Sequence, residues 1–161
     1  MQIEMSIKGL MVDPFTNSPI VILRDKDGQR VLPIWVGIFE ANAIAQQIEN
    51  VSPERPMTHD LLRNVIHDLN ASVQKVVVSD LQNNTFYALI YLSLESGTVA
   101  IDARPSDAIA LALRTRAPIF VEDTVIEHAR PVDVSSENGD AERLQKWLES
   151  LDPDDLGKYK M

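Results

Sequence analysis

Polar and apolar residues alternate along the first part of the chain, a pattern typical of β-strands. Turn-forming residues interrupt the alternation at 13–18 and 25–28, where Asp, Pro, Asn and Gly are concentrated. Three strands are therefore predicted, over residues 1–12, 18–25 and 30–37. Residues 38–49 carry apolar side chains, Phe39 among them, at helical spacing, and two prolines follow. This segment is predicted to be a helix.

A second helix is predicted after the two prolines. Thr58 is expected to cap its start, and Asn70 is expected to end it in the left-handed conformation. One apolar stripe runs along the helix between them, formed by Leu61, Leu62, Val65, Ile66 and Leu69. Alternating segments then predict three more strands, over residues 72–81, 85–94 and 97–103.

Pro105 opens another helix that extends to Thr115, so three strands followed by a helix occur twice. A displacement of 65 residues superposes the segment 43–45 on 108–110, and both read Ala-Ile-Ala. We interpret this match as a duplicated β3-α unit with one helix inserted between the copies, and a chance match of three residues is the alternative. Antiparallel hairpins that lead into helices predict an α+β fold, with antiparallel or mixed sheets flanked by helices.

The chain after the second copy has shorter elements and more acidic residues. A strand is predicted at 117–121, a helical turn at 122–129 and a C-terminal helix at 138–151, and residues 152–161 should fray. These patterns predict a domain over residues 1–127 and an acidic C-terminal extension with a helix over residues 128–161.

Composition narrows the class of protein. A chain of 161 residues is long enough to bury a core without covalent crosslinks. It contains no cysteine, which excludes disulfides and thiolate metal sites. The start lacks a charged lead followed by a long apolar run, and no stretch approaches the ~18 consecutive apolar residues that cross a bilayer. We therefore expect a cytoplasmic protein without a membrane partner.

The net charge of −9 argues against a polyanionic partner such as nucleic acid. Most of the acidity lies at the end, since residues 1–121 carry 10 Lys or Arg against 13 Asp or Glu, whereas residues 122–161 carry 5 against 11. The body is therefore compatible with a local basic patch, although no run of Lys or Arg marks one. The candidates for such a patch are Arg55, Arg63, Arg104, Arg114 and Arg116.

The stretch IDARPSDAIALALR places four polar residues where a strand passes into a helix. Ser106 and Asp107 fall in the first helical turn, where satisfying free N–H groups would explain both without any chemistry. Asp102 and Arg104 flank the junction, where side chains converge on clefts. If Asp102 and Asp107 face one cleft, they can hold a divalent cation such as magnesium or manganese, or act as acid and base. A structural ion pair of Arg104 with Asp102 or Glu40 is the alternative.

Two further candidates lie at other helix starts. Glu40 is near the start of the first helix, where capping again offers a structural explanation. His59 follows Thr58 and can transfer a proton near neutral pH, but it does not face the adjacent Asp60, and a surface role is the alternative. Aromatic residues are interpreted as core or sheet-face residues, namely Trp35, Phe86 and Tyr87. The chain lacks the common nucleotide-binding, zinc-protease and serine-hydrolase motifs.

Several separated blocks resemble the bifunctional nuclease family: LPIWVGIFEANAIA, RPMTHDLL, TFYALIYL, and IDARPSDAIALALR followed by PIFV. The resemblance extends over about residues 1–127. The polar positions that match are Glu40, Thr58, His59, Asp60, Asp102, Arg104, Ser106 and Asp107. One difference is Asn83-Asn84, where the family commonly has Asp-Gly, and this pair should still turn the hairpin because Asn tolerates positive φ. The other is the acidic end after Val121, which opposes polyanion binding unless it lies away from the cleft.

The resemblance implies a compact α+β domain that forms a homodimer or a higher homo-oligomer and has DNase or RNase activity on nucleic acid. In the nuclease hypothesis, Asp102 and Asp107, with Glu40, position a divalent ion or act as base, while Arg104 contacts phosphate and His59 transfers a proton. The alternative is a non-catalytic homo-oligomeric interaction or regulatory module in which the same residues are caps and interface pairs. A third hypothesis is a site for a small acidic metabolite at the paired helix starts.

Overall fold

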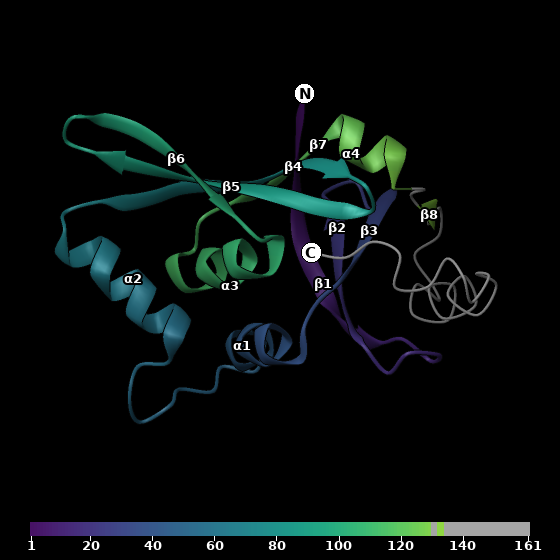
Figure 1. Cartoon of the computed structure of the whole chain (residues 1–161), viewed down its shortest axis with the longest axis horizontal. Helices are drawn as coiled ribbons and strands as arrows, with labels where there is room; N and C mark the ends of the chain where they lie inside the picture. Colours follow the sequence, from purple (N-terminus) through teal and green to yellow (C-terminus); the bar gives the residue numbers. More distant parts are fainter. Residues whose placement is uncertain (130–131, 134–161) are drawn as a thin grey trace.

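The computed structural model describes residues 1–129 and 132–133 (Figure 1). The helix predicted at 138–151 and the end predicted to fray at 152–161 lie outside the described residues. The strands are β1 (Gln2–Val12), β2 (Pro19–Asp25), β3 (Arg30–Trp35), β4 (Ser72–Gln82), β5 (Thr85–Leu94), β6 (Gly97–Ala103), β7 (Ile119–Glu122) and β8 (Val132–Asp133). The helices are α1 (Ile38–Ile48), α2 (Thr58–Asp68), α3 (Pro105–Thr115) and α4 (Asp123–His128).

The described strands form one mixed sheet in the order β6-β5-β4-β7-β1-β2-β3-β8. The antiparallel units β1-β2-β3 and β4-β5-β6 lie on either side of β7, which runs parallel to β4 and antiparallel to β1. Each unit continues into a helix, α1 or α3, and α2 separates the two units in the sequence. The predicted α+β fold, with three strands and a helix occurring twice, is confirmed.

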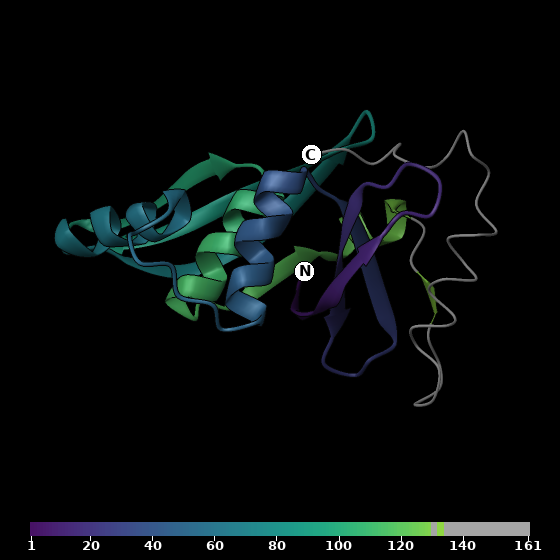
Figure 2. The same cartoon turned by 90° about the horizontal axis from the view of Figure 1, so that it is seen from below.

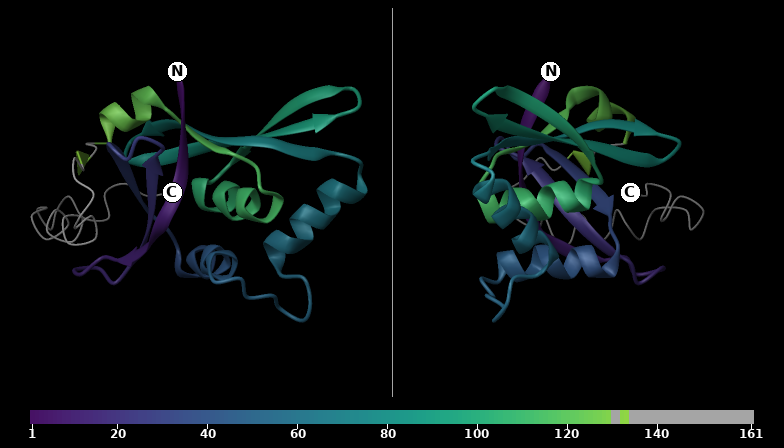
Figure 3. Two further views of the ribbon diagram at one scale, coloured as in Figure 1. Left: turned by 180° about the vertical axis from the view of Figure 1, so that it is seen from behind. Right: turned by 60° about the vertical axis from the view of Figure 1, so that its left-hand side comes forward.

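Helices α1, α2 and α3 lie along one side of the sheet. Figure 2 shows α1 and α3 side by side, and α3 also packs against β4 and β5. Helix α2 contacts α3 and lies at the end of the molecule away from β1, β2 and β3 (Figure 3). Within the described part of the chain, none of the helices is long and apolar enough to cross a membrane.

The core lies between α1, α3, α4 and the sheet. Ile44 of α1 and Ile109 of α3, the isoleucines of the two Ala-Ile-Ala segments, are both fully buried. Trp35 and Phe86 are buried, as predicted. Tyr87 is the sheet-face alternative, with 41% of its surface exposed, because successive side chains on a strand point to opposite faces of the sheet. The sheet therefore contributes one residue of this aromatic pair to the core and the other to the surface.

Local signals set most element ends as predicted. Pro105 is the first residue of α3. Asn70, after α2, has φ of 60°, and Asn83 and Asn84 turn the β4–β5 hairpin with φ of 51° and 61°. The prediction that Thr58 caps α2 is wrong, because the cap is the preceding Met57, whose N–H donates to Asp60 Oδ2 at 3.0 Å. A carboxylate three residues into the helix thus satisfies the backbone at its start.

The apolar stripe of α2 is largely exposed. Four of its members are between 38% and 70% exposed, namely Leu61, Leu62, Val65 and Leu69. The buried residue of this helix is instead Asp60. The reason is that α2 contacts α3 at the end of the sheet rather than lying across the sheet, so its apolar face has no layer opposite it. The helical pattern was correct, but it did not indicate burial.

Candidate functional site

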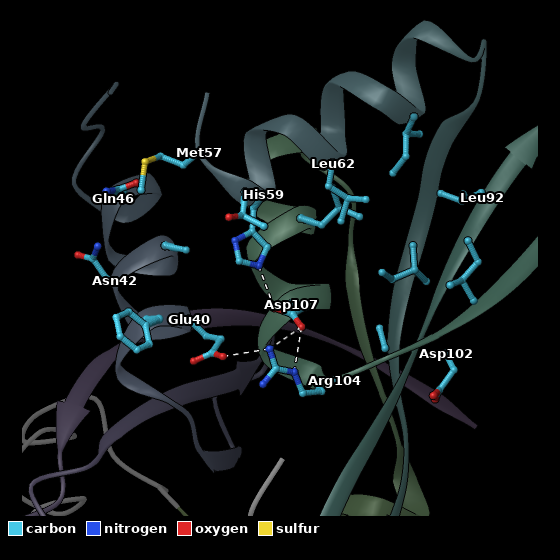
Figure 4. Close-up of a pocket in the computed structure, with 18 residues that line it drawn as sticks. Glu40, Asn42, Gln46, Met57, His59, Leu62, Leu92, Asp102, Arg104 and Asp107 are labelled. Carbon is cyan, nitrogen blue, oxygen red and sulfur yellow. Dashed lines mark hydrogen bonds and ion pairs between the residues drawn. The ribbon is translucent and has the colours of Figure 1, made fainter. Parts of the chain in front are cut away.

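A pocket of about 740 Å³ lies among α1, α2, α3 and the strands β5 and β6 (Figure 4). The starts of all three helices contribute to its wall, and the strands supply much of its apolar surface. A concave site of this size, mostly apolar with a few converging polar groups, is typical of ligand-binding and active sites. The pocket is therefore the candidate functional site.

Four polar side chains form a continuous chain of contacts at the wall of this pocket. Arg104 Nη2 lies 3.0 Å from Glu40 Oε1 and 3.0 Å from Asp107 Oδ2. Arg104 Nε also donates to Asp107 Oδ2 at 3.0 Å. The other carboxylate oxygen of Asp107, Oδ1, lies 2.9 Å from His59 Nε2. The order of the polar chain is thus Glu40, Arg104, Asp107 and His59, as the dashed lines in Figure 4 show.

Each member of the polar chain comes from the start of a helix. Glu40 lies in the first turn of α1, His59 in the first turn of α2, and Asp107 in the first turn of α3, with Arg104 at the α3 cap position. No side-chain cap hydrogen bond is formed at the Arg104 cap position of α3, and Asp107 in the first turn contacts His59 and Arg104. The Arg104–Glu40 ion pair considered from the sequence is present.

Charge and exposure are distributed unevenly along the polar chain. The Asp107 hydrogen bond, together with the charges of Asp107 and Glu40, outweighs burial and raises the pKa of Arg104. Arg104 therefore stays cationic while its side chain is 54% exposed. The side chains of Glu40 and His59 are far more enclosed, with 16% and 12% exposed. The arrangement presents one accessible cation and one largely enclosed imidazole to the same pocket.

Asp102 lies apart from the polar chain, although it lines the same pocket. Figure 4 shows its carboxylate on β6, separated from the contacts around Asp107. Both oxygens of Asp107 already have partners in His59 and Arg104. Among residues 1–129 and 132–133, no three or more His, Asp or Glu side chains are grouped so that they could hold a metal ion. The pair of Asp102 and Asp107 is smaller than such a group, and its binding of a divalent cation stays a prediction.

A second ion pair, between Asp60 of α2 and Arg114 of α3, joins these two helices. Arg114 Nε donates to Asp60 Oδ1 at 2.8 Å, and its other nitrogens donate to the carbonyls of Ala110 and Ala43. The Arg114 side chain has no exposed surface, so its assignment to a basic surface patch is wrong. Burial opposes ionisation of Asp60, but hydrogen bonds from Met57 and Arg114 and the charge of Arg114 lower its pKa overall.

Three residues of α1 that the sequence analysis did not select also line the pocket: Phe39, Asn42 and Gln46. Their spacing of three and four residues places them on one helical face, opposite the buried Ala41 and Ile44. Phe39, which was assigned to the apolar pattern of this helix, is 84% exposed. The spacing was visible in the sequence, but the pocket opposite this face was not.

A family model described as the bifunctional nuclease domain matches residues 21–133. An uncharacterized protein of Mycobacterium tuberculosis is 40% identical over 163 residues, covering 95% of this chain and 97% of that protein. Bifunctional nuclease 2 of Arabidopsis thaliana is 30% identical over 105 residues, and Bifunctional nuclease 1 of Oryza sativa subsp. indica is 27% identical over 105 residues.

Coverage separates these relatives into two groups. The mycobacterial protein matches along nearly its whole length. Each of the two plant matches covers 63% of this chain and 32% of the plant protein, so the alignment spans about a third of the plant relatives. The family match includes β3 to β8, the helices α1 to α4 and the polar chain, whereas β1 precedes it and β2 lies partly outside it. The chain belongs to the bifunctional nuclease domain family.

Proposed function

We propose that the protein is a nuclease that hydrolyses phosphodiester bonds of DNA or RNA. The observation that carries this proposal is the polar chain of Glu40, Arg104, Asp107 and His59 at the wall of an open pocket. It combines a histidine with a carboxylate partner and an accessible cation, which are groups that phosphodiester hydrolysis needs. Membership of the bifunctional nuclease domain family supports the same reaction class.

His59 is proposed as the group that moves the proton. When Nε2–H donates to Asp107 Oδ1, the tautomer leaves Nδ1 as an acceptor for a proton from an attacking water. Asp107 then stabilises the imidazolium that forms, and the contact with Arg104 holds the Asp107 carboxylate in place. Asp107 is thus a positioning residue, and His59 is the general base or acid.

Arg104 is proposed as the phosphate contact. Its Nε and Nη2 atoms are used by the two carboxylates, whereas Nη1 has no hydrogen bond among the described residues and belongs to a half-exposed side chain. A guanidinium that is held on one edge can still donate from the other edge to a phosphate oxygen. Glu40 and Asp107 partly neutralise this cation, so phosphate binding depends on the direction of these donors more than on net charge.

We also propose that Asp102 and Asp107 together bind a divalent metal ion. Asp107 Oδ1 has His59 as its partner and Oδ2 has Arg104, so a magnesium or manganese ion would share one of these oxygens with its present partner or replace that partner. Cleavage assays with each ion and with a chelator test this role. Loss of cleavage in chelator, restored by metal in the wild type but not in Asp102→Asn, would support it.

The test of the nuclease proposal uses single-stranded and double-stranded DNA and RNA with His59→Asn and Arg104→Gln. We expect His59→Asn to lower kcat by about 10²- to 10⁴-fold, the usual contribution of a general acid or base. His67→Asn and Arg63→Gln are matched controls on α2, outside the residues that line the pocket. Equal cleavage by His59→Asn and His67→Asn preparations would identify the activity as a contaminant or the site as wrong.

We also propose, as the second candidate, a homo-oligomeric interaction module without catalysis. Leu61, Val65 and Leu69 are exposed along α2 at helical spacing, outside the residues that line the pocket. Strand β6 is an edge of the sheet, and its Val99 is also exposed. Protein interfaces commonly form at exposed apolar patches and at unpaired edge strands. Failure of the wild-type protein to cleave any of the four substrates would favour this candidate.

A further inference from the structure

The pocket has an extensive apolar wall beyond the polar chain. Strands, α2 and α3 supply this wall, with Leu62, Ile66, Ile90, Leu92, Ile101 and Leu111. A phosphodiester alone does not need such a surface, because a phosphate is recognised by hydrogen-bond donors and charge. The apolar wall therefore indicates a second part of the ligand that is itself largely apolar and flat-sided or bulky.

Phe39 adds an aromatic ring at the rim of the same pocket. Its side chain is 84% exposed, although it lies in the first turn of a helix whose opposite face is buried in the core. The next residue along the chain, Glu40, contacts Arg104. Phe39 and Arg104 both line this pocket, so one ligand can reach the ring and the proposed phosphate contact, as the base and phosphate of one nucleotide would require.

Two side-chain amides complete the lining. Asn42 and Gln46 follow Phe39 on the pocket face of α1, and Figure 4 shows them on the helix across from His59. An amide carries both a donor and an acceptor, the combination that pairs with the edge of a nucleobase. Apolar walls, an exposed ring and two amides together fit the two faces and the polar edge of a base.

From this lining we infer that the pocket takes one unpaired nucleobase, so that the substrate class is single-stranded nucleic acid. This inference rests on the proposed nuclease function and specifies its substrate. In a duplex each base is stacked on both faces and paired along its edge, so it would have to leave the stack to reach the pocket. An unpaired strand places a base there without that cost.

The experiment uses single-stranded DNA in which one nucleotide at a time is replaced by a stable abasic analogue. The wild-type protein should cleave the bond beside the abasic position about tenfold less than the same bond in the intact strand, because the base contributes stacking energy. Phe39→Ala should lower cleavage of the intact strand by a similar factor and should be nearly insensitive to the abasic change. Phe15→Ala, at an exposed ring outside the pocket lining, is the matched control and should behave like the wild type.

The outcomes separate the inference from the proposed function. Equal cleavage of intact and abasic strands, with dependence on His59 preserved, would overturn the base pocket and leave the nuclease proposal standing.

If the wild-type protein cleaves nothing, the nuclease proposal fails, and strand binding measured by fluorescence anisotropy then decides the inference. Tighter binding of the intact strand that requires Phe39 would support the pocket, and equal binding would overturn it. A change of molar mass in Phe39→Ala without a change in strand binding would show that a second copy covers the pocket, which also overturns it.

Discussion

Asp107 illustrates how tertiary contacts change the use of a single side chain. A carboxylate in the first turn of a helix ordinarily interacts with the free N–H groups and the dipole at that end. In this protein its two oxygens contact His59 and Arg104 instead. His59 comes from a helix 48 residues earlier in the sequence, so no local pattern indicates the pair. The position of Asp107 in the first helical turn follows from the local sequence, whereas its contact with His59 depends on the tertiary structure.

Asp60 gives a prediction about stability at the residue scale. Its pKa is lowered in the folded protein, so its ionised form stabilises the fold above about pH 4, the ordinary range of the Asp pKa, and this contribution is lost as pH falls through the lower folded value. Asp60→Asn should lower the free energy of unfolding by about 3–5 kcal/mol at neutral pH, because it leaves Arg114 buried without its partner. Urea unfolding at several pH values measures both effects.

The difference in free energy of unfolding between wild type and Asp60→Asn should narrow below about pH 4, where the Asp60 carboxyl of the unfolded chain begins to be protonated, and should keep narrowing until the folded carboxyl is protonated at its lower pKa. Asp13 and Asp123 also have lowered pKa values, but they contribute equally to the free energy of unfolding of both proteins, so their contributions cancel in the difference. Asp68→Asn, at an 82% exposed side chain on the same helix, is the control and should change stability by less than about 0.5 kcal/mol. A difference that stays constant from neutral pH down to about pH 3 would contradict the assignment.

At the element scale, close packing at the start of α1 controls where the Glu40 carboxylate lies. Gly37 is the cap residue, with φ of −71° and ψ of 157°, a conformation that alanine also adopts. A Cβ at this position would collide with Glu40 Oε2. The absence of a side chain at residue 37 therefore allows the Glu40 carboxylate to occupy its place beside Arg104. Glycine at position 37 therefore contributes to the Glu40–Arg104 contact as well as to the start of the helix.

Gly37→Ala should consequently act on the polar chain with little effect on the fold. We expect kcat/KM for cleavage to fall by up to about fivefold, the equivalent of one partly exposed ion pair, and Glu40→Gln to do the same. The double variant should be no slower than either single variant, because both remove one interaction. Steady-state kinetics measure the rates, and far-UV circular dichroism checks the fold. Fully additive losses would show that residue 37 acts through something other than Glu40.

At the scale of the whole molecule, α2 leaves much of its apolar surface exposed. The three helices enclose the pocket, yet α2 extends beyond α3 at one end and keeps Leu61, Val65 and Leu69 exposed. Burial of apolar surface contributes roughly 25 cal/mol per Å², so a second copy that covered this stripe would gain stability. Self-association through α2 is compatible with catalysis, since these residues are outside the pocket lining.

The double variant Leu61→Lys/Leu69→Lys tests this surface. If α2 mediates self-association, the wild-type protein should have the molar mass of a dimer or larger assembly, and the double variant should shift toward the monomer because two charges would have to be buried. Val12→Lys is the control at another exposed apolar position, and it should leave the molar mass unchanged. Size-exclusion chromatography with light scattering gives the result. A wild-type monomer, or an assembly unaffected by the double variant, would refute the interface.

The sequence by itself determined the secondary structure and much of its order. Alternation of polar and apolar residues marks the strands, while Pro105, Asn70 and the Asn83-Asn84 turn set ends that the structure confirms. These signals work because backbone preferences and side-chain periodicity act within a few neighbouring residues. The resemblance to the bifunctional nuclease family was also readable from short blocks, and the family match confirms it.

Only the tertiary structure decided which of these residues meet. It pairs His59 with Asp107, buries Arg114 against Asp60 across 54 residues of sequence, and leaves Asp102 apart from the polar chain. It also exposes the stripe of α2, which reads in sequence like the stripe of a buried helix. The physical reason is that contacts between distant segments depend on strand order and on how the helices pack on the sheet. Local patterns constrain neither of these, because each segment keeps the same preferences whichever partner the fold brings against it.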